Sequence, residues 1–470
     1  MQIKNNYISN ELFKINKMPH HICSMNYEQR LVQINKISKY VKELRKKIES
    51  VSREEKNSTD PNFLNFSLPI FMWAYYGFSI KSILEDLIFI YKDIFKDYIN
   101  KINSKFSCDI PYNKPYKKIL FCSSRLCKST TSVYKSTYEI INHLSRLSDF
   151  HVDVMTTFPI EENAQKSYEN CKNILRITSL ENNINLIAGG RYDAVVYPDM
   201  NMDVSTSCIG LFRLAPYQIT TFGHSESSGT ADYYITSKNY ETSTPEENYT
   251  EKVVSFNSLA LKYKKIQIED YIKDFKNKNY FQIPENSNIY YCNSSFFKMG
   301  AEMFEIFKGI LEADPLAIIC LTKLNVEYWD GVFFNSLDNY LDLKYKNRIK
   351  FIQRLDYKQN LNFLHISDVF IESYPFGNMN STLESFAVGL PVISMPTTKI
   401  NGRFTYGFYK KMGLEKDYCV FSIKDYISKA VSVACDKDLS KRKELIEKSK
   451  VLFEEQESAI EWENFLRNLA

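Results

Sequence analysis

The sequence DVFIESYPFGNMNSTLESFAVGLPVIS, residues 368–394, has the pattern of a strand, a tight polar loop, a helix and a second strand. The loop contains Gly377 and Asn378, a helix starts near Ser381, and Gly389 precedes the next apolar pair. In a parallel α/β sheet, ligands collect where strands end and helices begin, because unpaired N–H groups and the helix dipole attract anions. The stretch therefore predicts a parallel α/β fold with an anion site at this loop.

Outside this stretch, apolar runs alternate with helical patterns in two series. One series lies within residues 117–260 and the other within 280–440, and a segment rich in Lys, Asn and Asp joins them. Such alternation predicts two doubly wound, Rossmann-like halves with a cleft between them, closed by a C-terminal helix in residues 441–470. The expected strands are 118–124, 152–157, 192–198, 288–292, 317–321 and 349–352, and the expected helices are 132–147, 301–311, 358–365, 423–434 and 439–469.

The first part of the chain, residues 1–110, is predicted to be all-helical. Between residues 27 and 102 the apolar side chains recur at helical spacing among Lys, Arg and Glu. The clearest series is Leu31, Ile34, Ile37, Val41, Leu44 and Ile48.

Composition narrows the function classes. A chain of 470 residues exceeds what one hydrophobic core usually supports, so more than one domain is expected. The net charge of +4 is too small to favour nucleic acid or a membrane surface as partner. The ten cysteines lack metal-site spacing, and the N-terminus lacks a signal peptide pattern. We therefore expect reduced thiols in a cytoplasmic protein, with no metal and no cofactor.

Glu384 has two interpretations. It follows Ser381 by three residues, which is the spacing of a capping box at a helix N-terminus. Alternatively, its carboxylate lies at the mouth of the cleft and accepts hydrogen bonds from two ribose hydroxyls of a sugar nucleotide. In that case the diphosphate would be bound by polar groups of Asn378, Asn380, Ser381 and Thr382, whose other common use is in turns.

Three further residues are candidates by position. Lys298 follows an apolar strand and the polar pair Ser294 and Ser295, where its charge can neutralise a phosphate; a solvated surface lysine is the alternative. Arg403 lies in a loop after a strand and can face the pyrophosphate or simply be solvated. His224 lies in a loop flanked by glycines, where it is exposed for catalysis or serves the structure.

The motifs resemble one family: the O-linked GlcNAc transferases, with SPINDLY-like relatives and the bacterial cytoplasmic N-glucosyltransferases that modify high-molecular-weight adhesins. Four ordered blocks within about residues 117–438 carry the resemblance. They are Tyr192-Asp-Ala-Val-Val-Tyr-Pro-Asp199, Phe212-Arg-Leu-Ala-Pro-Tyr-Gln218 with Gly223-His224 and Ser228-Gly229, Lys298, and Pro375-Phe-Gly-Asn-Met-Asn380 with Glu384 and Gly389-Leu-Pro391.

The resemblance implies a GT-B fold and an inverting, metal-independent transfer of GlcNAc or glucose from a UDP-sugar to a protein side chain, either Ser/Thr or Asn. It implies that Lys298 and Ser295 lie at the diphosphate, that Glu384 binds the ribose, and that Arg403 faces the pyrophosphate. Residues 380–382 would bind the phosphates, and His224 would line the acceptor or sugar side. The expected partners are a UDP-sugar and an acceptor protein or peptide.

Two departures from the family pattern keep alternatives open. Glu384 replaces an Asp of the relatives, and histidines that relatives carry within residues 123–138 are absent. The alternatives are a transferase acting on a glycan or small molecule, and a UDP-sugar-binding pseudoenzyme or interaction module.

Overall fold

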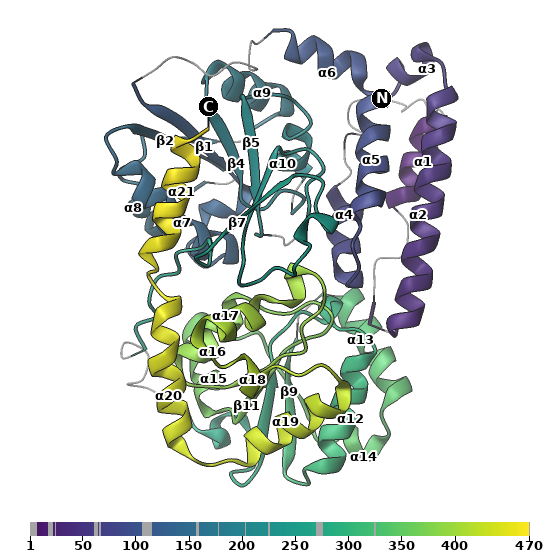
Figure 1. Cartoon of the computed structure of the whole chain (residues 1–470). Coiled ribbons are helices and arrows are strands. Elements are labelled where there is room, and N and C mark those ends of the chain that lie inside the picture. Colours follow the sequence, from purple (N-terminus) through teal and green to yellow (C-terminus); the bar gives the residue numbers. More distant parts are fainter. Residues whose placement is uncertain are drawn as a thin grey trace.

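The structure is a computed structural model that describes residues 7–16, 22–23, 25–60, 64, 67–105, 115–156, 159–176, 178–202, 204–223, 226–268, 276–323 and 326–469. It has two stacked α/β halves with a group of helices along one side of them (Figure 1). The predicted architecture of two doubly wound parallel sheets preceded by helices is confirmed.

The first half contains a seven-stranded parallel sheet in the order β3-β2-β1-β4-β5-β6-β7. Successive residues of β1 bury their side chains in different clusters, Ile119 and Phe121 in one and Leu120 and Cys122 in the other, so both faces of the sheet are covered. The strands are β1 (Lys117–Cys122), β2 (Phe150–Thr156), β3 (Asn173–Arg176), β4 (Ala194–Tyr197), β5 (Tyr217–Thr221), β6 (Tyr233–Ser237) and β7 (Lys252–Phe256). The helices are α7 (Ser132–Ser145), α8 (Glu162–Ser167), α9 (Leu180–Gly189) and α10 (Val204–Ile209).

The second half contains a five-stranded parallel sheet in the order β10-β9-β8-β11-β12. Its strands are β8 (Asn288–Cys292), β9 (Ala317–Thr322), β10 (Ile349–Ile352), β11 (Val369–Ile371) and β12 (Val392–Ile393). Its helices are α12 (Glu302–Ala313), α13 (Glu327–Tyr340), α14 (Leu343–Lys346), α15 (Tyr357–Ile366), α16 (Asn380–Ala387), α17 (Phe404–Met412), α18 (Glu415–Tyr418) and α19 (Ile423–Cys435).

The helical segment before the first sheet packs against both halves. Its helices are α1 (Tyr7–Asn16), α2 (Tyr27–Ser50), α3 (Arg53–Asn57), α4 (Ser67–Trp73), α5 (Lys81–Ile94) and α6 (Lys96–Asn103). The fully buried Arg30 of α2 forms an ion pair of 2.7 Å with Glu302 of α12 in the second half. The hydroxyl of Ser79 donates to the backbone oxygen of Glu247 in the first half.

The C-terminal part corrects one expectation. A single helix over 439–469 is wrong, because the chain forms α20 (Leu439–Ser449) and α21 (Gln456–Arg467) with a break between them. At the break Phe453 pairs with Tyr263, and Glu454 adopts a φ of 54° while its N–H donates to the Tyr263 oxygen at 2.7 Å. This turn lets α20 contact α16 in the second half and α21 contact α7 in the first, as the yellow helices of Figure 1 show.

A further contact, an ion pair, joins the two halves. Lys399 of the second half and Glu226 of the first form an ion pair in which both side chains are almost fully buried. Because a buried charge without a partner is costly, this pair holds the halves in one arrangement.

Among the described residues, no helix is long and apolar enough to cross a membrane.

Candidate functional site

The loops that leave the neighbouring strands β8 and β11 are bonded to each other. The hydroxyl of Ser294 and the side-chain amide of Asn378 make hydrogen bonds of 2.9 and 3.0 Å. Met299 and Pro375 form an antiparallel bridge between the same loops. Since carboxyl ends of parallel strands are where α/β sheets bind ligands, these loops define the candidate site.

Lys298 is the cation of this site. It ends the 3-10 turn η6 (Phe296–Lys298), which Ser295 precedes, and its ammonium lies 4.9 Å from the centre of the Phe376 ring. Burial lowers the pKa of Lys298 to about 8, against the opposing effect of the Glu372 carboxylate. Among the described residues no ion pair to Lys298 is recorded, so its charge is available to an anionic ligand.

Helix α16 begins at the end of the β11 loop, whose Asn378 is bonded to Ser294 of the loop that carries Lys298. Its N-cap position is Met379, which makes no side-chain cap, and Ser381 lies inside the helix. The capping-box interpretation of Ser381 and Glu384 is therefore wrong. The first N–H groups of a helix lack partners within it, and here they belong to Asn380, Ser381 and Thr382.

The side chains of Thr382 and Asn380, at the start of α16, differ in their hydrogen bonds. The Thr382 hydroxyl is buried against the hydroxyl of Thr405 at 2.8 Å, so it serves the packing of the second half. The side-chain oxygen of Asn380 is buried without a hydrogen-bond partner among the described residues. The free N–H groups at this helix end can donate to an anionic ligand, whereas the Asn380 oxygen, itself an acceptor, cannot bind an anion.

Glu384 lies one turn further along α16 and faces the first half. Its Oε1 accepts from Lys135 of α7 at 2.8 Å, and its Oε2 accepts from the Asn360 side chain of α15 at 3.2 Å. Only 8% of the Glu384 side chain is exposed. The carboxylate is therefore held at the boundary between the halves, and its contact with a ribose stays a prediction.

A cavity of about 480 Å³ lies beside this ion pair. Its lining includes Lys135 and hydroxyls such as that of Ser129. Four tyrosines also line it, from both halves and the crossing between them: Tyr134, Tyr138, Tyr263 and Tyr357. Burial and the nearby Glu384 carboxylate raise the pKa of the Tyr263 hydroxyl, which stays neutral. Aromatic rings with hydroxyls and a cation suit a ligand that carries rings and negative charge.

Two predicted site residues stand apart. The Arg403 guanidinium donates to the backbone oxygens of Tyr240, at 2.5 Å, and Thr397, at 3.0 Å, and thereby ties the second half to the first. Its contact with a pyrophosphate stays a prediction. His224 lies outside the described residues, and its role stays a prediction as well.

The sequence reasoning missed three residues that organise the site. Glu372 is fully buried at the end of β11, and its Oε1 accepts from the Asn378 N–H at 2.8 Å and from the Thr405 hydroxyl at 2.5 Å. An acidic residue directly after an apolar strand was a usable signal for Glu372. Lys135 and Asn360 gave no such signal, because their partner Glu384 is 249 and 24 residues away.

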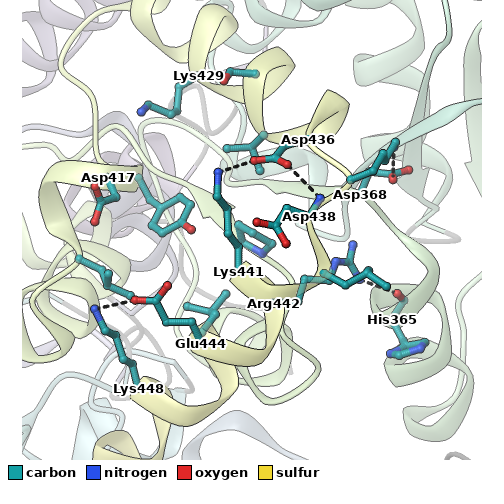
Figure 2. Close-up of a pocket in the computed structure, with 18 of the residues that line it drawn as sticks. His365, Asp368, Asp417, Lys429, Asp436, Asp438, Lys441, Arg442, Glu444 and Lys448 are labelled. Atoms are coloured by element: carbon teal, nitrogen blue, oxygen red, sulfur yellow. Dashed lines mark hydrogen bonds and ion pairs between the residues drawn. The ribbon is translucent and has the colours of Figure 1, made fainter.

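A larger cavity, of about 710 Å³, lies at the opposite end of the second sheet (Figure 2). Its lining residues include Asp368 and Pro391, which directly precede β11 and β12. Many of its charges pair with one another, as Lys441 does with Asp436 and Lys448 with Glu444. This is the amino-terminal edge of the sheet, where parallel α/β sheets do not usually bind their ligands.

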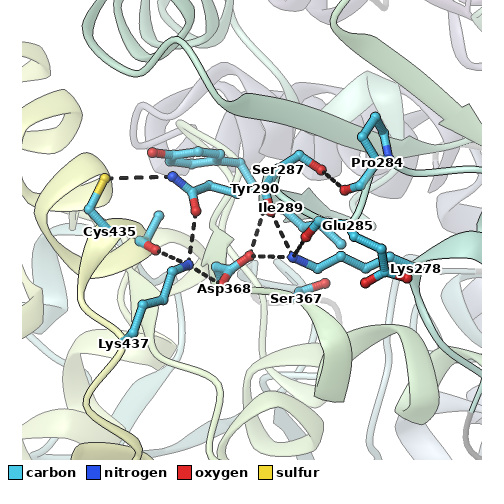
Figure 3. Close-up of polar contacts among 12 residues, drawn as sticks. Lys278, Pro284, Glu285, Ser287, Ile289, Tyr290, Ser367, Asp368, Cys435 and Lys437 are labelled. Atoms are coloured by element: carbon cyan, nitrogen blue, oxygen red, sulfur yellow. Dashed lines mark hydrogen bonds and ion pairs between the residues drawn. The ribbon is translucent and has the colours of Figure 1, made fainter.

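The wall of that cavity around Asp368 is a structural network (Figure 3). The Asp368 carboxylate accepts from Lys437 at 2.6 Å and from the Ile289 N–H at 2.8 Å, and Lys278 lies 3.7 Å away. Lys437 also donates to the Asn288 side chain at 2.8 Å. These bonds join the starts of β8 and β11 to the end of α19. The charged side chains of this wall neutralise one another, so they need no ligand.

Comparisons with known proteins agree with the fold. No protein-family model matches the chain. Two curated relatives match it, both named UDP-glucose:protein N-beta-glucosyltransferase, from Actinobacillus pleuropneumoniae serotype 5b (strain L20) and serotype 7 (strain AP76). Each is 23% identical over 244 residues, which cover 51% of this chain and 38% of the relative. The matched stretch thus spans well under half of these relatives.

Among solved structures, an O-GlcNAc transferase mutant from Thermobaculum terrenum superposes with a TM-score of 0.70 at 14% identity, covering 94% of this chain and 83% of that chain. A sucrose-phosphate synthase from Thermosynechococcus elongatus superposes with a TM-score of 0.50 at 13% identity, covering 75% and 99%. The predicted GT-B fold is confirmed by these likenesses, and so is the predicted resemblance to O-GlcNAc transferases and protein N-glucosyltransferases.

Proposed function

We propose that this chain is a glycosyltransferase that moves glucose or GlcNAc from a UDP-sugar to a protein side chain, with inversion and without a metal ion. The names of the curated relatives and of the superposed transferase support a UDP-sugar donor and a protein acceptor. Inversion follows from the family resemblance. The acceptor is either a Ser/Thr hydroxyl or an Asn amide. Labelling of peptides rich in Ser/Thr or in Asn distinguishes the two.

One observation supports the proposal: a lysine, a helix N-terminus and a carboxylate all come from the segments that follow the carboxyl ends of β8 and β11. Lys298 follows β8, α16 begins after β11, and Glu384 of α16 contacts Lys135 of the first half. The cation and the free N–H groups suit a diphosphate, and the carboxylate suits the hydroxyls of a ribose.

In the proposed reaction the acceptor atom attacks the anomeric carbon while the bond from that carbon to the UDP oxygen breaks. The proton that the acceptor hydroxyl or amide loses passes to the departing UDP phosphate or to water. Negative charge then develops on the terminal phosphate of UDP. Lys298 and the N–H groups of Asn380, Ser381 and Thr382 stabilise that charge where it forms, which is where electrostatic catalysis contributes most. His224 is proposed to line the acceptor or sugar side.

Binding of the donor is tested first, by titration calorimetry with UDP, ADP, GDP, UDP-glucose and UDP-GlcNAc. We expect UDP to bind and Lys298→Met and Glu384→Gln each to weaken it by about tenfold or more, the loss typical of a hydrogen bond to a charged group. Lys429→Met, in the larger cavity, is the matched control and should bind UDP like the unchanged chain. A chain that binds no uridine nucleotide would contradict the proposal.

The residues around α7 favour a second candidate function: a module that binds the donor but does not transfer its sugar. Its cavity-lining residues are Ser129, Thr130, Tyr134, Lys135 and Tyr138, with no histidine among them. Incubation with radiolabelled UDP-glucose and UDP-GlcNAc and peptides rich in Ser/Thr or in Asn separates the two candidates. A transferase labels a peptide or hydrolyses the donor, whereas a binding module does neither while still binding UDP.

A further inference from the structure

Lys135 belongs to the first half, yet it contacts the carboxylate of the second half on which the proposed function depends. Its ammonium lies 2.8 Å from Glu384 Oε1, and 19% of the Lys135 side chain is exposed. The same ammonium lies 4.1 Å from the centre of the Tyr357 ring. The lysine is therefore held from two sides, by a carboxylate and by an aromatic face, and both partners belong to the second half.

Glu384 is correspondingly held by one contact on each oxygen. Asn360 donates to Oε2 at 3.2 Å, and the Asn360 oxygen itself accepts from the Tyr291 hydroxyl at 3.0 Å. This chain of contacts starts in the sheet of the second half and ends at Lys135 in the first. A glutamate has one more rotatable bond than an aspartate, so it needs such contacts to keep a single orientation.

The contacts leave part of the hydrogen-bonding capacity of the Glu384 carboxylate unused. An ionised carboxylate offers about four lone-pair directions, and the recorded bonds of Glu384 use two of them. The remaining two lie on different oxygens, as a pair of neighbouring hydroxyls requires. The positive charge of Lys135 also reduces the repulsion between this carboxylate and a diphosphate bound at Lys298.

We propose that Lys135 is a positioning residue that aims the Glu384 carboxylate at the two ribose hydroxyls of the donor, so that the chain discriminates ribonucleotides from deoxynucleotides only when the first half supplies this lysine. The inference rests on the proposed function, because it presumes a nucleoside diphosphate at the site.

The test compares UDP with 2′,3′-dideoxyuridine diphosphate, which lacks both hydroxyls, by titration calorimetry. For the unchanged chain we expect UDP to bind about tenfold or more tightly than the dideoxy compound, since hydrogen bonds to a charged group are lost. In Lys135→Met the ratio of the two dissociation constants should fall to about two or less. Lys135→Arg keeps the charge and should restore most of the ratio.

Lys429→Met is the control. Lys429 lines the larger cavity at the opposite end of the second sheet, away from Glu384, so its removal should leave the ratio unchanged. A purely structural role of Lys135 would weaken both ligands by the same factor and keep the ratio, and this result would overturn the inference. Tighter binding of UDP by Lys135→Met would overturn it as well, because the lysine would then compete with the donor.

The outcomes separate this inference from the proposed function. If the unchanged chain binds neither compound, the proposed function fails and the inference fails with it. If the unchanged chain binds both compounds equally well, the uridine nucleotide site stands, but Glu384 does not bind the ribose hydroxyls and only the inference is overturned.

Discussion

At Lys298 burial and charge act in opposite directions. Burial favours the neutral amine, and the buried Glu372 carboxylate favours the ammonium, with a resulting pKa of about 8. Burial also raises the pKa of the Glu372 carboxyl, to about 6. Both groups are therefore largely charged near pH 7, but the lysine loses its proton at a pH where ordinary lysines keep it.

If Lys298 contacts a diphosphate as proposed, the binding of that ligand should depend on pH. Lys298 is cationic below its pKa, so the affinity for UDP should be highest near pH 7 and should fall as the pH rises through about 8. Titration calorimetry from about pH 6.5 to 9.5 measures the change. Lys298→Arg should bind with little dependence on pH over this range, because arginine stays charged. An unchanged affinity of the native chain up to pH 9.5 would mean that Lys298 does not contact the diphosphate.

At the scale of elements, the loop between β11 and α16 depends on close packing around Gly377. The Gly377 N–H donates to the backbone oxygen of Asn401 at 2.8 Å, and the N–H of the next residue, Asn378, donates to the Glu372 carboxylate. A Cβ at position 377 would lie 2.7 Å from Glu372 Oε1, which is closer than real contacts allow. The backbone of this loop thus sets where α16 begins and where its free N–H groups point.

Gly377→Ala should therefore displace the loop. We expect a loss of about 1–3 kcal/mol in the free energy of unfolding, as for other overpacked sites, together with a clear loss of UDP affinity. Gly331→Ala is the control, because Gly331 lies in α13 with open space around its Cβ position; there the change should stabilise by up to about 1 kcal/mol. Chemical denaturation with urea measures both. Equal stability of the two variants would contradict the packing argument.

At the scale of the whole molecule, the helical segment forms part of the wall behind the candidate site. In the 3-10 turn η2 (Ala74–Tyr76), the ring of Tyr75 lies 4.6 Å from that of Phe376 and 5.0 Å from that of Phe297. The Ala74 oxygen accepts from the Asn401 side chain at 3.0 Å. The loops that carry Lys298 and Asn378 are therefore supported by residues more than two hundred positions earlier in the chain.

Variants of the buried ion pair between Arg30 and Glu302 test whether the helical segment stabilises the second half. Arg30→Met leaves the Glu302 carboxylate without its ionic partner, and we expect a loss of about 3–5 kcal/mol in the free energy of unfolding. The double variant Arg30→Met/Glu302→Gln should recover part of it. Lys166→Met removes an exposed pair with Glu162 and should change stability by less than about 1 kcal/mol. Thermal unfolding of the four proteins compares them, and a single variant as stable as the control would refute the argument.

Prediction from the sequence succeeded where a local pattern decides the structure. The apolar series of α2 is buried at Ile34, Ile37, Val41, Leu44 and Ile48 as its helical spacing predicts. It did not extend to β6 and β7, which were not among the expected strands, or to β3 (Asn173–Arg176), whose residues are mostly exposed and lack an apolar run. It also failed at the break after α20, where Glu454 takes a left-handed conformation that its bond to Tyr263 stabilises.

The sequence by itself determined the alternation of strands and helices, the helical segment, the loop at Gly377 and the candidates Lys298 and Glu384, because each follows from local spacing and residue type. Only the tertiary structure decided that Glu384 faces Lys135 instead of capping α16. It also decided that Arg403 ties the two halves and that Tyr75 supports the loops that carry Lys298 and Asn378. These outcomes depend on contacts between residues far apart in the chain, and the free energy of such contacts is set by packing and burial, which local spacing does not encode.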